Sequence, residues 1–288
     1  MKLLIVNADD FGLTKGVNRA IIDGHLGGII TSATMMVTAR ARDDAVARLA
    51  DAPLLSVGCH LVLVDGKPAA RPSFVRSLVD TTDSFPKTFS SFLLNLSSGR
   101  AKIAEIELEL RAQIEEMLAL GIEPSHLDSH KHTHAHPKIA DIVLRLAEQY
   151  RIKCVRNPYE SAFDNKVAGV LSARRLIAAA MLAFKSSFMN KIKRHNLFCP
   201  QHFHGFVVTG RLGPENILSV LEKVEQGVNE LMCHPGFLDD ELQDMPTKLR
   251  QSRERELAAV KSEQARLAVA KLGIKLTSFA ALRSEKLI

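Results

Sequence analysis

The stretch Lys2-Leu3-Leu4-Ile5-Val6-Asn7-Ala8-Asp9-Asp10-Phe11-Gly12 opens the chain with an apolar run that leads into two carboxylates. Its β-rich first half predicts a buried strand, and Gly12 allows a tight exit from it. Neighbouring strand residues point to opposite faces, but at a strand end two consecutive side chains can both reach one pocket. There, one carboxylate can bind a metal while the other moves a proton. A turn with two solvated Asp residues is the alternative.

Helical and strand patterns alternate along the rest of the chain. After Thr14, a suitable N-cap, helices are expected at 15–26, 40–50, 101–120, 137–149, 168–193, 214–225 and 251–272. Further strands are expected at 29–37, 54–64, 124–128, 152–156, 206–209, 229–233 and 274–279. This order favours parallel strands covered by helices. The sequence therefore predicts an α/β fold, a single-domain distorted (β/α) barrel of the TIM-like type spanning residues 1–288.

Two segments interrupt this rhythm. Residues 65–99 are rich in Gly and Pro and predict an excursion of loop and short helices, of the kind that often forms a lid. A basic helical insertion is expected at about 160–200, because residues 165–214 contain eight Lys and Arg and no Asp or Glu. The part at 166–195 is amphipathic. It would either lie on an anionic membrane surface or, as we expect more, pack on the barrel or on the partner in a homodimer.

Composition excludes several classes of protein. The 46% of hydrophobic and 24% of charged residues are typical of a globular protein, and no apolar run is long enough to span a membrane. No signal peptide is visible, and the 4 Cys include no CxxC pair, so we expect reduced thiols and a cytoplasmic location. Nucleic-acid binding is not expected, because no recognised binding motif accompanies the basic segment.

Polar side chains stand at the expected ends of five different strands, where a β/α barrel places its active site. They are Asp9, Asp10, His60, Asp128, His130, Arg156 and His234. Two His and one carboxylate would leave open positions on a metal, which activates water for hydrolysis. The second Asp could then act as general base, and His234 could protonate the leaving group. No G-x-S-x-G elbow or phosphate-binding loop suggests other chemistry.

Four histidines, at positions 130, 132, 134 and 136, follow one another at every second residue. In an extended chain this spacing puts them on one face, and His is the commonest metal ligand. Pro137 starts the next helix, so we expect His130 and His132 to lie deepest, with His134 and His136 at the rim or capping that helix. A solvated His-rich loop is the alternative, and for His60 the alternative is a hydrogen-bonded core histidine.

Several separated motifs resemble the YdjC-like carbohydrate deacetylases. They are Val6-Asn7-Ala8-Asp9-Asp10-Phe11-Gly12-Leu13, Gly58-Cys59-His60-Leu61, residues 126–134, Met232-Cys233-His234-Pro235-Gly236 and residues 274–279. The resemblance implies a deformed seven-stranded barrel of the polysaccharide deacetylase type. It also implies a divalent metal ion, Mg²⁺ or Zn²⁺, and removal of N-acetyl groups from amino sugars.

By the same resemblance, Asp9 is the catalytic base, His234 is the acid, and the metal ligands are Asp10, His60 and His130. His132, Asp128 and Arg156 are expected to contact the substrate. Lys131 departs from the His found at its position in many family members.

Residues 60–68 and 156–158 are similar to the hopanoid-biosynthesis-associated branch, which acts on N-acetylglucosamine attached to a hopanoid lipid. Such a glycolipid would suit a cytoplasmic protein held at the inner face of the membrane by its basic segment. A soluble chito-oligosaccharide such as diacetylchitobiose is the alternative substrate. A non-catalytic barrel that binds metal or sugar is the alternative class.

Overall fold

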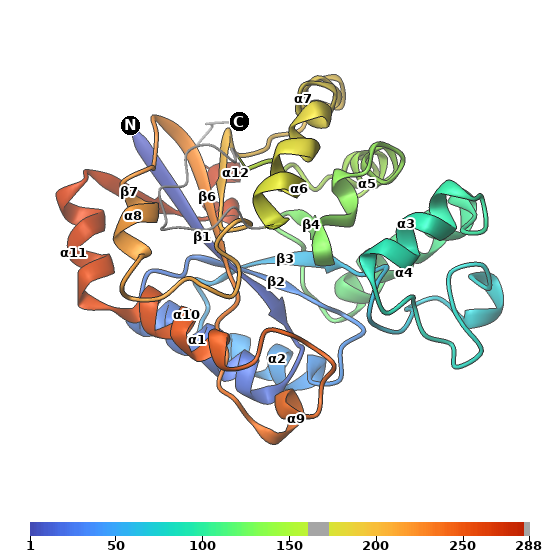
Figure 1. Ribbon diagram of the computed structural model, residues 1–288, viewed down its shortest axis with the longest axis horizontal. Coiled ribbons are helices and arrows are strands. Elements are labelled where there is room, and N and C mark those ends of the chain that lie inside the picture. The colour runs from blue at the N-terminus through green and yellow to red at the C-terminus, as the bar shows by residue number, and fades with distance from the viewer. Residues whose placement is uncertain (161–172, 285–288) are drawn as a thin grey trace.

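The fold is a curled, parallel sheet with helices around it (Figure 1). The structure, a computed structural model, describes residues 1–160 and 173–284. Within these residues the strands are β1 (Lys2–Phe11), β2 (Ser32–Met35), β3 (Ser56–Leu61), β4 (Leu127–Ser129), β5 (His202–His204), β6 (Gly227–Cys233) and β7 (Ile274–Thr277). They form one seven-stranded sheet in the order β4-β3-β2-β1-β6-β5, with β7 also paired to β1. The predicted α/β class and distorted barrel are confirmed.

Strand β1 is the centre of the sheet. One edge pairs with β6, while the other pairs first with β7 and then with β2. The register with β2 shifts between Ala8 and Phe11, and Asp10 adopts a positive φ of 68°. A bulge of this kind re-aims side chains. The two carboxylates therefore lie inside β1, at a bulge rather than beyond the strand end.

The predicted strand at 152–156 is reduced to isolated bridges. Leu127 pairs with Val155, and Cys154 pairs with Phe198, both in parallel. These bridges connect β4 to the segment that leads into β5, so they link the two ends of the sheet. The strand predicted at 206–209 was wrong: that segment forms turns, and the strand lies earlier, at β5.

Most predicted helices are present. They are α1 (Lys15–Gly27), α2 (Arg42–Arg48), α4 (Ile103–Ala119), α5 (Pro137–Gln149), α8 (Ile217–Leu221), α10 (Gln251–Lys261) and α11 (Glu263–Lys271), with short α9 (Asp240–Gln243) and α12 (Phe279–Ser284) in addition. Thr14 caps α1 as predicted, since its side chain accepts a hydrogen bond from Val17 N. The single helix predicted at 251–272 is divided at Ser262, which caps α11 by accepting from Ala265 N.

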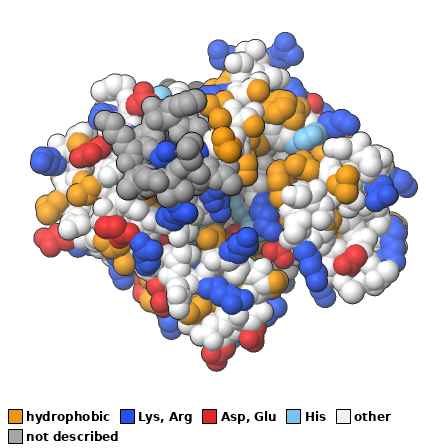
Figure 2. Space-filling view, viewed as in Figure 1, with side chains coloured by type: hydrophobic (Ala, Val, Ile, Leu, Met, Phe, Trp, Pro, Cys, Tyr) orange, Lys and Arg blue, Asp and Glu red, His pale blue; other side chains and the backbone are white. Residues whose placement is uncertain are grey.

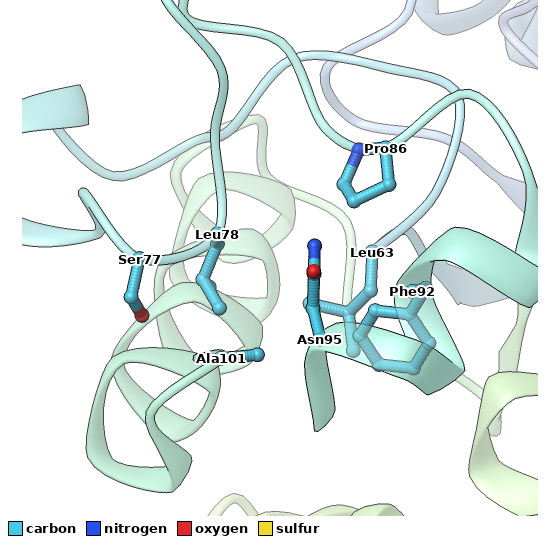
Figure 3. Close-up of a pocket in the computed structure, with 7 residues that line it drawn as sticks. All are labelled: Leu63, Ser77, Leu78, Pro86, Phe92, Asn95 and Ala101. Carbon is cyan, nitrogen blue, oxygen red and sulfur yellow. The ribbon is translucent and has the colours of Figure 1, made fainter. Parts of the chain in front are cut away.

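The excursion at 65–99 contains a 3₁₀ turn at Pro72–Phe74 and the helix α3 (Phe89–Ser97). Apolar side chains from within the excursion and from its flanks line a small hollow that has no room for water (Figure 3). They include Leu63, Leu78 and Phe92. Glu109 on α4 also accepts hydrogen bonds from the backbone of residues 69 and 70. The excursion is therefore packed against α4.

The basic insertion contains α6 (Ala173–Met181), a 3₁₀ turn at Leu182–Phe184, and α7 (Lys185–Arg194). The start of the helix predicted at 168–193 lies outside the described residues. On α7, Phe188 and Ile192 are buried, and Phe188 packs edge-on against Tyr159. No helix within the described residues is long and apolar enough to cross a membrane.

Candidate active site

The carboxyl ends of β1, β3, β4 and β6 bring the predicted site residues together. Asp9 and Asp10 come from β1, His60 from β3, and Asp128 from β4, while His130 and His234 directly follow β4 and β6. Each of the four strand residues is 2% exposed or less, and the His130 side chain is 18% exposed. The cluster is therefore a buried polar centre that reaches the surface through its histidines.

Asp10, His60 and His130 form an open triangle of ligand atoms. Asp10 Oδ1 lies 3.6 Å from His60 Nε2 and 3.2 Å from His130 Nδ1, and the three atoms lie within 4.8 Å of one another. Asp10 Oδ1 is buried and makes no hydrogen bond of good geometry. A carboxylate oxygen and two imidazole nitrogens that converge in this way fit a divalent cation and leave it open positions.

His60 is oriented by the carboxylate behind it. Its Nδ1 lies 2.7 Å from Asp128 Oδ1, which directs Nε2 toward Asp10. Burial opposes protonation, but the surrounding carboxylates, Asp128 above all, outweigh it and raise the pKa of His60 to about 9. Asp9, His60 and Asp128 are also close enough to hold an ion. The oxygens of both carboxylates are already engaged, those of Asp9 by Arg156 and those of Asp128 by Arg156 and His60, so this second group fits a cation less well.

Arg156 is the guanidinium at the centre of the site, and it is fully buried. Its Nη1 and Nη2 donate to the two oxygens of Asp9 at 2.8 and 2.6 Å, and Nη1 also lies 2.7 Å from Asp128 Oδ2. Its Nε donates to Glu230 Oε1 at 2.8 Å. Burial alone raises the pKa of Asp9, but Arg156 outweighs it and holds that pKa well below its ordinary value. Contact of Arg156 or Asp128 with a substrate stays a prediction.

Asp10 has a different arginine, which the sequence did not reveal. Arg253 on α10 donates from Nη2 to Asp10 Oδ2 at 2.5 Å and from Nε to the Leu249 carbonyl. Burial works against ionisation, yet Arg253 holds the pKa of Asp10 well below its ordinary value. Asp10 therefore remains a carboxylate, with one oxygen bound to Arg253 and the other turned toward the histidines.

His234, which directly follows β6, lies close to Asp9. Its Nε2 is 3.9 Å from Asp9 Oδ2, and its ring is 11% exposed. Glu256, another residue missed by sequence, accepts the His234 backbone N–H at 2.6 Å and the Gly210 N–H at 2.9 Å. Glu256 thus fixes the turn that carries His234.

The His-rich segment is not extended, so the predicted row of four histidines on one face was wrong. Residues His130–Ala135 form a 3₁₀ turn in which Lys131 and His132 have positive φ. His134 is fully buried rather than at the rim, and its Nδ1 lies 2.5 Å from Ser129 Oγ. His136 caps α5, as predicted, by accepting from Lys138 N. The turn sends the four histidines in different directions, whereas an extended chain would have placed them on one face.

The prediction that His130 and His132 lie deepest was wrong: His134 is 0% exposed and His132 7%, while the His130 side chain is 18% exposed. The His132 ring packs edge-on against Phe203 and Phe206, and its Nδ1 is buried without a hydrogen-bond partner. Burial lowers the pKa of His132 well below its ordinary value. It is therefore a neutral ring with one unused nitrogen.

Comparisons with known proteins show which proteins the chain is similar to. A family model described as YdjC-like protein matches residues 3–271. The chain is 32% identical over 276 residues to a carbohydrate deacetylase of Geobacillus stearothermophilus, which covers 96% of each chain. It is 32% identical over 286 residues to one of Vibrio cholerae serotype O1, covering 99% of this chain and 98% of the other. A crystal structure of an Enterococcus faecalis V583 protein aligns with a TM-score of 0.79, 29% identity and 98% coverage of both chains.

Proposed function

The chain belongs to the YdjC-like protein family, and on this premise we propose that it is a metal-dependent hydrolase that removes N-acetyl groups from an amino sugar. The observation that carries the proposal is the triangle of ligand atoms from Asp10, His60 and His130. Beside it lies a second carboxylate, Asp9, which is bound by Arg156 and is not part of the triangle. Relatives that match over nearly the whole chain are named carbohydrate deacetylases, which supports the same chemistry.

Asp10, His60 and His130 would hold a divalent cation, Mg²⁺ or Zn²⁺. When bound, such an ion supplies positive charge that polarises the amide carbonyl and makes water more acidic. Asp128 keeps the His60 ring in the orientation that presents Nε2 to this space. His130 is the more exposed ligand and lies at the edge through which a substrate would enter.

Asp9 would act as the base and His234 as the acid. Hydrolysis adds the oxygen of water to the acetyl carbon and breaks the bond to nitrogen, so one proton must leave the water and one must reach the amine. Asp9 stays ionised and so can accept the first proton, while Arg156, by binding both of its oxygens, fixes its position and lowers its basicity. His234 Nε2, 3.9 Å from Asp9, can deliver a proton to the departing nitrogen.

The finer proposal concerns the substrate, an N-acetylglucosaminyl hopanoid lipid. Three exposed apolar side chains on the basic insertion, Leu176, Ile177 and Phe184, would suit a lipid-linked sugar. His132, with its unused ring nitrogen, is the proposed sugar contact among the predicted residues. A soluble chito-oligosaccharide such as diacetylchitobiose is the alternative.

The test measures acetate release by the purified protein from both substrates, before and after chelation and after return of Mg²⁺ or Zn²⁺. We expect activity to vanish on chelation and to return with metal, and the glycolipid to be turned over faster. Activity that survives chelation would contradict metal dependence. Sugar binding without acetate release from either substrate would instead favour a non-catalytic barrel.

A further inference from the structure

The basic insertion is only half packed. On α7, Phe188 and Ile192 are buried, whereas on α6 and the turn after it Leu176 is 67% exposed, Ile177 49% and Phe184 46%. Figure 2 shows hydrophobic side chains gathered at the upper part of this face, where Figure 1 places α6. The insertion therefore packs through α7 and through Ala178 of α6, while other apolar side chains of α6 are exposed to solvent.

A cationic hollow lies next to these apolar side chains. It has a volume of about 740 Å³ and is lined by four cations, Arg174, Arg211, Lys248 and Arg250, and by polar groups that include Thr209 and Ser252. No carboxylate lines it among the described residues. Arg174 belongs to α6, so the hollow and the exposed apolar residues share one helix. Together, Leu176, Ile177, Phe184 and the four cations make up what we call the docking face.

The hollow adjoins the active site. Gly210, in its wall, donates its N–H to Glu256, which also accepts the backbone N–H of His234. Ser252, another wall residue, directly precedes Arg253, the partner of Asp10. A ligand in the hollow would thus lie next to Glu256, which holds the backbone of His234, and next to Arg253, which binds Asp10.

We propose that the docking face binds an anionic lipid bilayer, with the apolar side chains of α6 in the interface and lipid phosphates in the cationic hollow. Basic residues beside exposed apolar ones are the pattern of surfaces that lie in an anionic interface. Residues 165–214 contain no Asp or Glu, so nothing in that segment repels lipid phosphate. A free phosphate would account for the hollow but not for the exposed Leu, Ile and Phe side chains.

The acidic residues nearby fit this orientation. Asp240 and Glu241 belong to α9, which Figure 1 places at the lower end of the molecule. Figure 2 shows acidic side chains there, away from the hydrophobic group at the top, with Lys and Arg side chains between them. The Lys and Arg side chains thus lie between the apolar group and α9, whose Gln243 lines the hollow.

The test is co-sedimentation of the full-length protein with vesicles of phosphatidylcholine alone or with about 30% phosphatidylglycerol. We expect binding only to the anionic vesicles, and its loss at about 0.5 M salt. Arg211→Gln and Lys248→Gln should each weaken binding about fivefold, because each removes one cation from the surface. The double variant Leu176→Gln/Ile177→Gln should weaken it by at least as much.

Matched controls lie outside the docking face. Leu94→Gln removes an apolar side chain on α3 that is 63% exposed, and Lys271→Gln removes an exposed cation on α11. Both should bind like the wild type. Equal binding to neutral and anionic vesicles, no binding to either, or face variants that behave like the controls would overturn the proposal. So would binding of inorganic phosphate in the absence of vesicle binding. This test measures vesicle binding and not acetate release, so its result does not depend on whether the deacetylase proposal holds.

Discussion

Asp9 and Asp10 are neighbours in sequence, almost equally buried, and each is paired with a buried arginine, yet their surroundings differ. Arg156 binds both oxygens of Asp9 and also forms ion pairs with Asp128 and Glu230. Arg253 binds one oxygen of Asp10 and leaves the other beside His60 and His130. The bulge in β1 makes this possible, because it turns the two side chains toward different partners.

This difference supports the division of roles that we propose for the two carboxylates. An oxygen free of hydrogen bonds and facing two imidazoles is available to a cation, whereas a carboxylate held at both oxygens is fixed in position. The adjacent pair can therefore bind a metal and move a proton without either residue doing both. The resemblance to deacetylases suggested this division, and the two arginines give it a physical cause.

Asp10→Asn is the substitution with the largest expected effect. The amide can still accept a hydrogen bond from Arg253 Nη2, but it removes the negative charge that faces His60 and His130. We expect metal binding to be lost and acetate release to fall by more than the roughly 10⁴-fold that removal of a proton-transfer group causes. Metal content and acetate release measure both. Retention of stoichiometric metal would break the proposed assignment.

Asp9→Asn should separate the two functions. It removes the proposed base and leaves Asp10, His60 and His130 in place, so metal content should stay at the wild-type level. Turnover should fall by about 10² to 10⁴-fold, the usual contribution of a general base. Rates at saturating substrate, together with metal analysis, give the result. If Asp9→Asn lost the metal while Asp10→Asn kept it, the two roles would have to be exchanged.

Asp128→Asn tests the connection that Asp128 makes between Arg156, the partner of Asp9, and His60, which faces Asp10. Asp128 accepts from Arg156 on one oxygen and orients His60 with the other. An amide in its place would hold the ring less firmly, and loss of such a supporting group typically weakens metal affinity about 10 to 100-fold. Titration of the metal-free protein measures the affinity. Ser129→Ala is a neighbouring control, because Ser129 contacts His134 rather than a proposed ligand, and its affinity should be unchanged.

The sequence predicted the fold where the signals were local. The apolar run of β1, the cap at Thr14 and the proline at the start of α5 each depend on a few adjacent residues, and all three were confirmed. The predictions failed where a partner distant in sequence decides the structure. Residues 152–156 have strand-like composition, but among the described residues only Leu127 and Phe198 form bridges with them. Residues 206–209 are apolar because they pack beside His132 and α6, and not because they extend a strand.

The same limit applies to the site. The sequence placed carboxylates and histidines at strand ends, since barrel topology brings those ends together. The sequence analysis missed Arg253 and Glu256 because both lie on α10, a helix rich in charged residues, where nothing local separates them from surface charges. Glu230 offered one usable signal, a lone carboxylate inside the apolar run of β6. A charge buried in a strand requires a partner, and here the partner is Arg156.

Glu230 also makes the two arginine systems respond differently to pH. It shares Arg156 with Asp9, but its Oε2 has no hydrogen-bond partner. Burial dominates over the pull of Arg156 and raises the pKa of Glu230 from 4.5 to about 7. Between these two values the folded protein holds a proton that the unfolded chain has released. The contribution of Glu230 to the free energy of unfolding therefore falls as the pH rises from about 4.5 to about 7.

Glu230→Gln should remove that contribution. The amide oxygen can still accept from Arg156 Nε, and the amide nitrogen would occupy the place of an oxygen that makes no hydrogen bond. Relative to wild type, the variant should gain on the order of 1–2 kcal/mol of unfolding free energy between mildly acidic and neutral pH. Denaturant titrations across this range measure the difference, with exposed Glu123→Gln as control. If the difference in unfolding free energy between variant and wild type did not change with pH, Glu230 would stay ionised beside Arg156. The pairing of Asp9 with Arg156 would then be no more sensitive to pH than the pairing of Asp10 with Arg253.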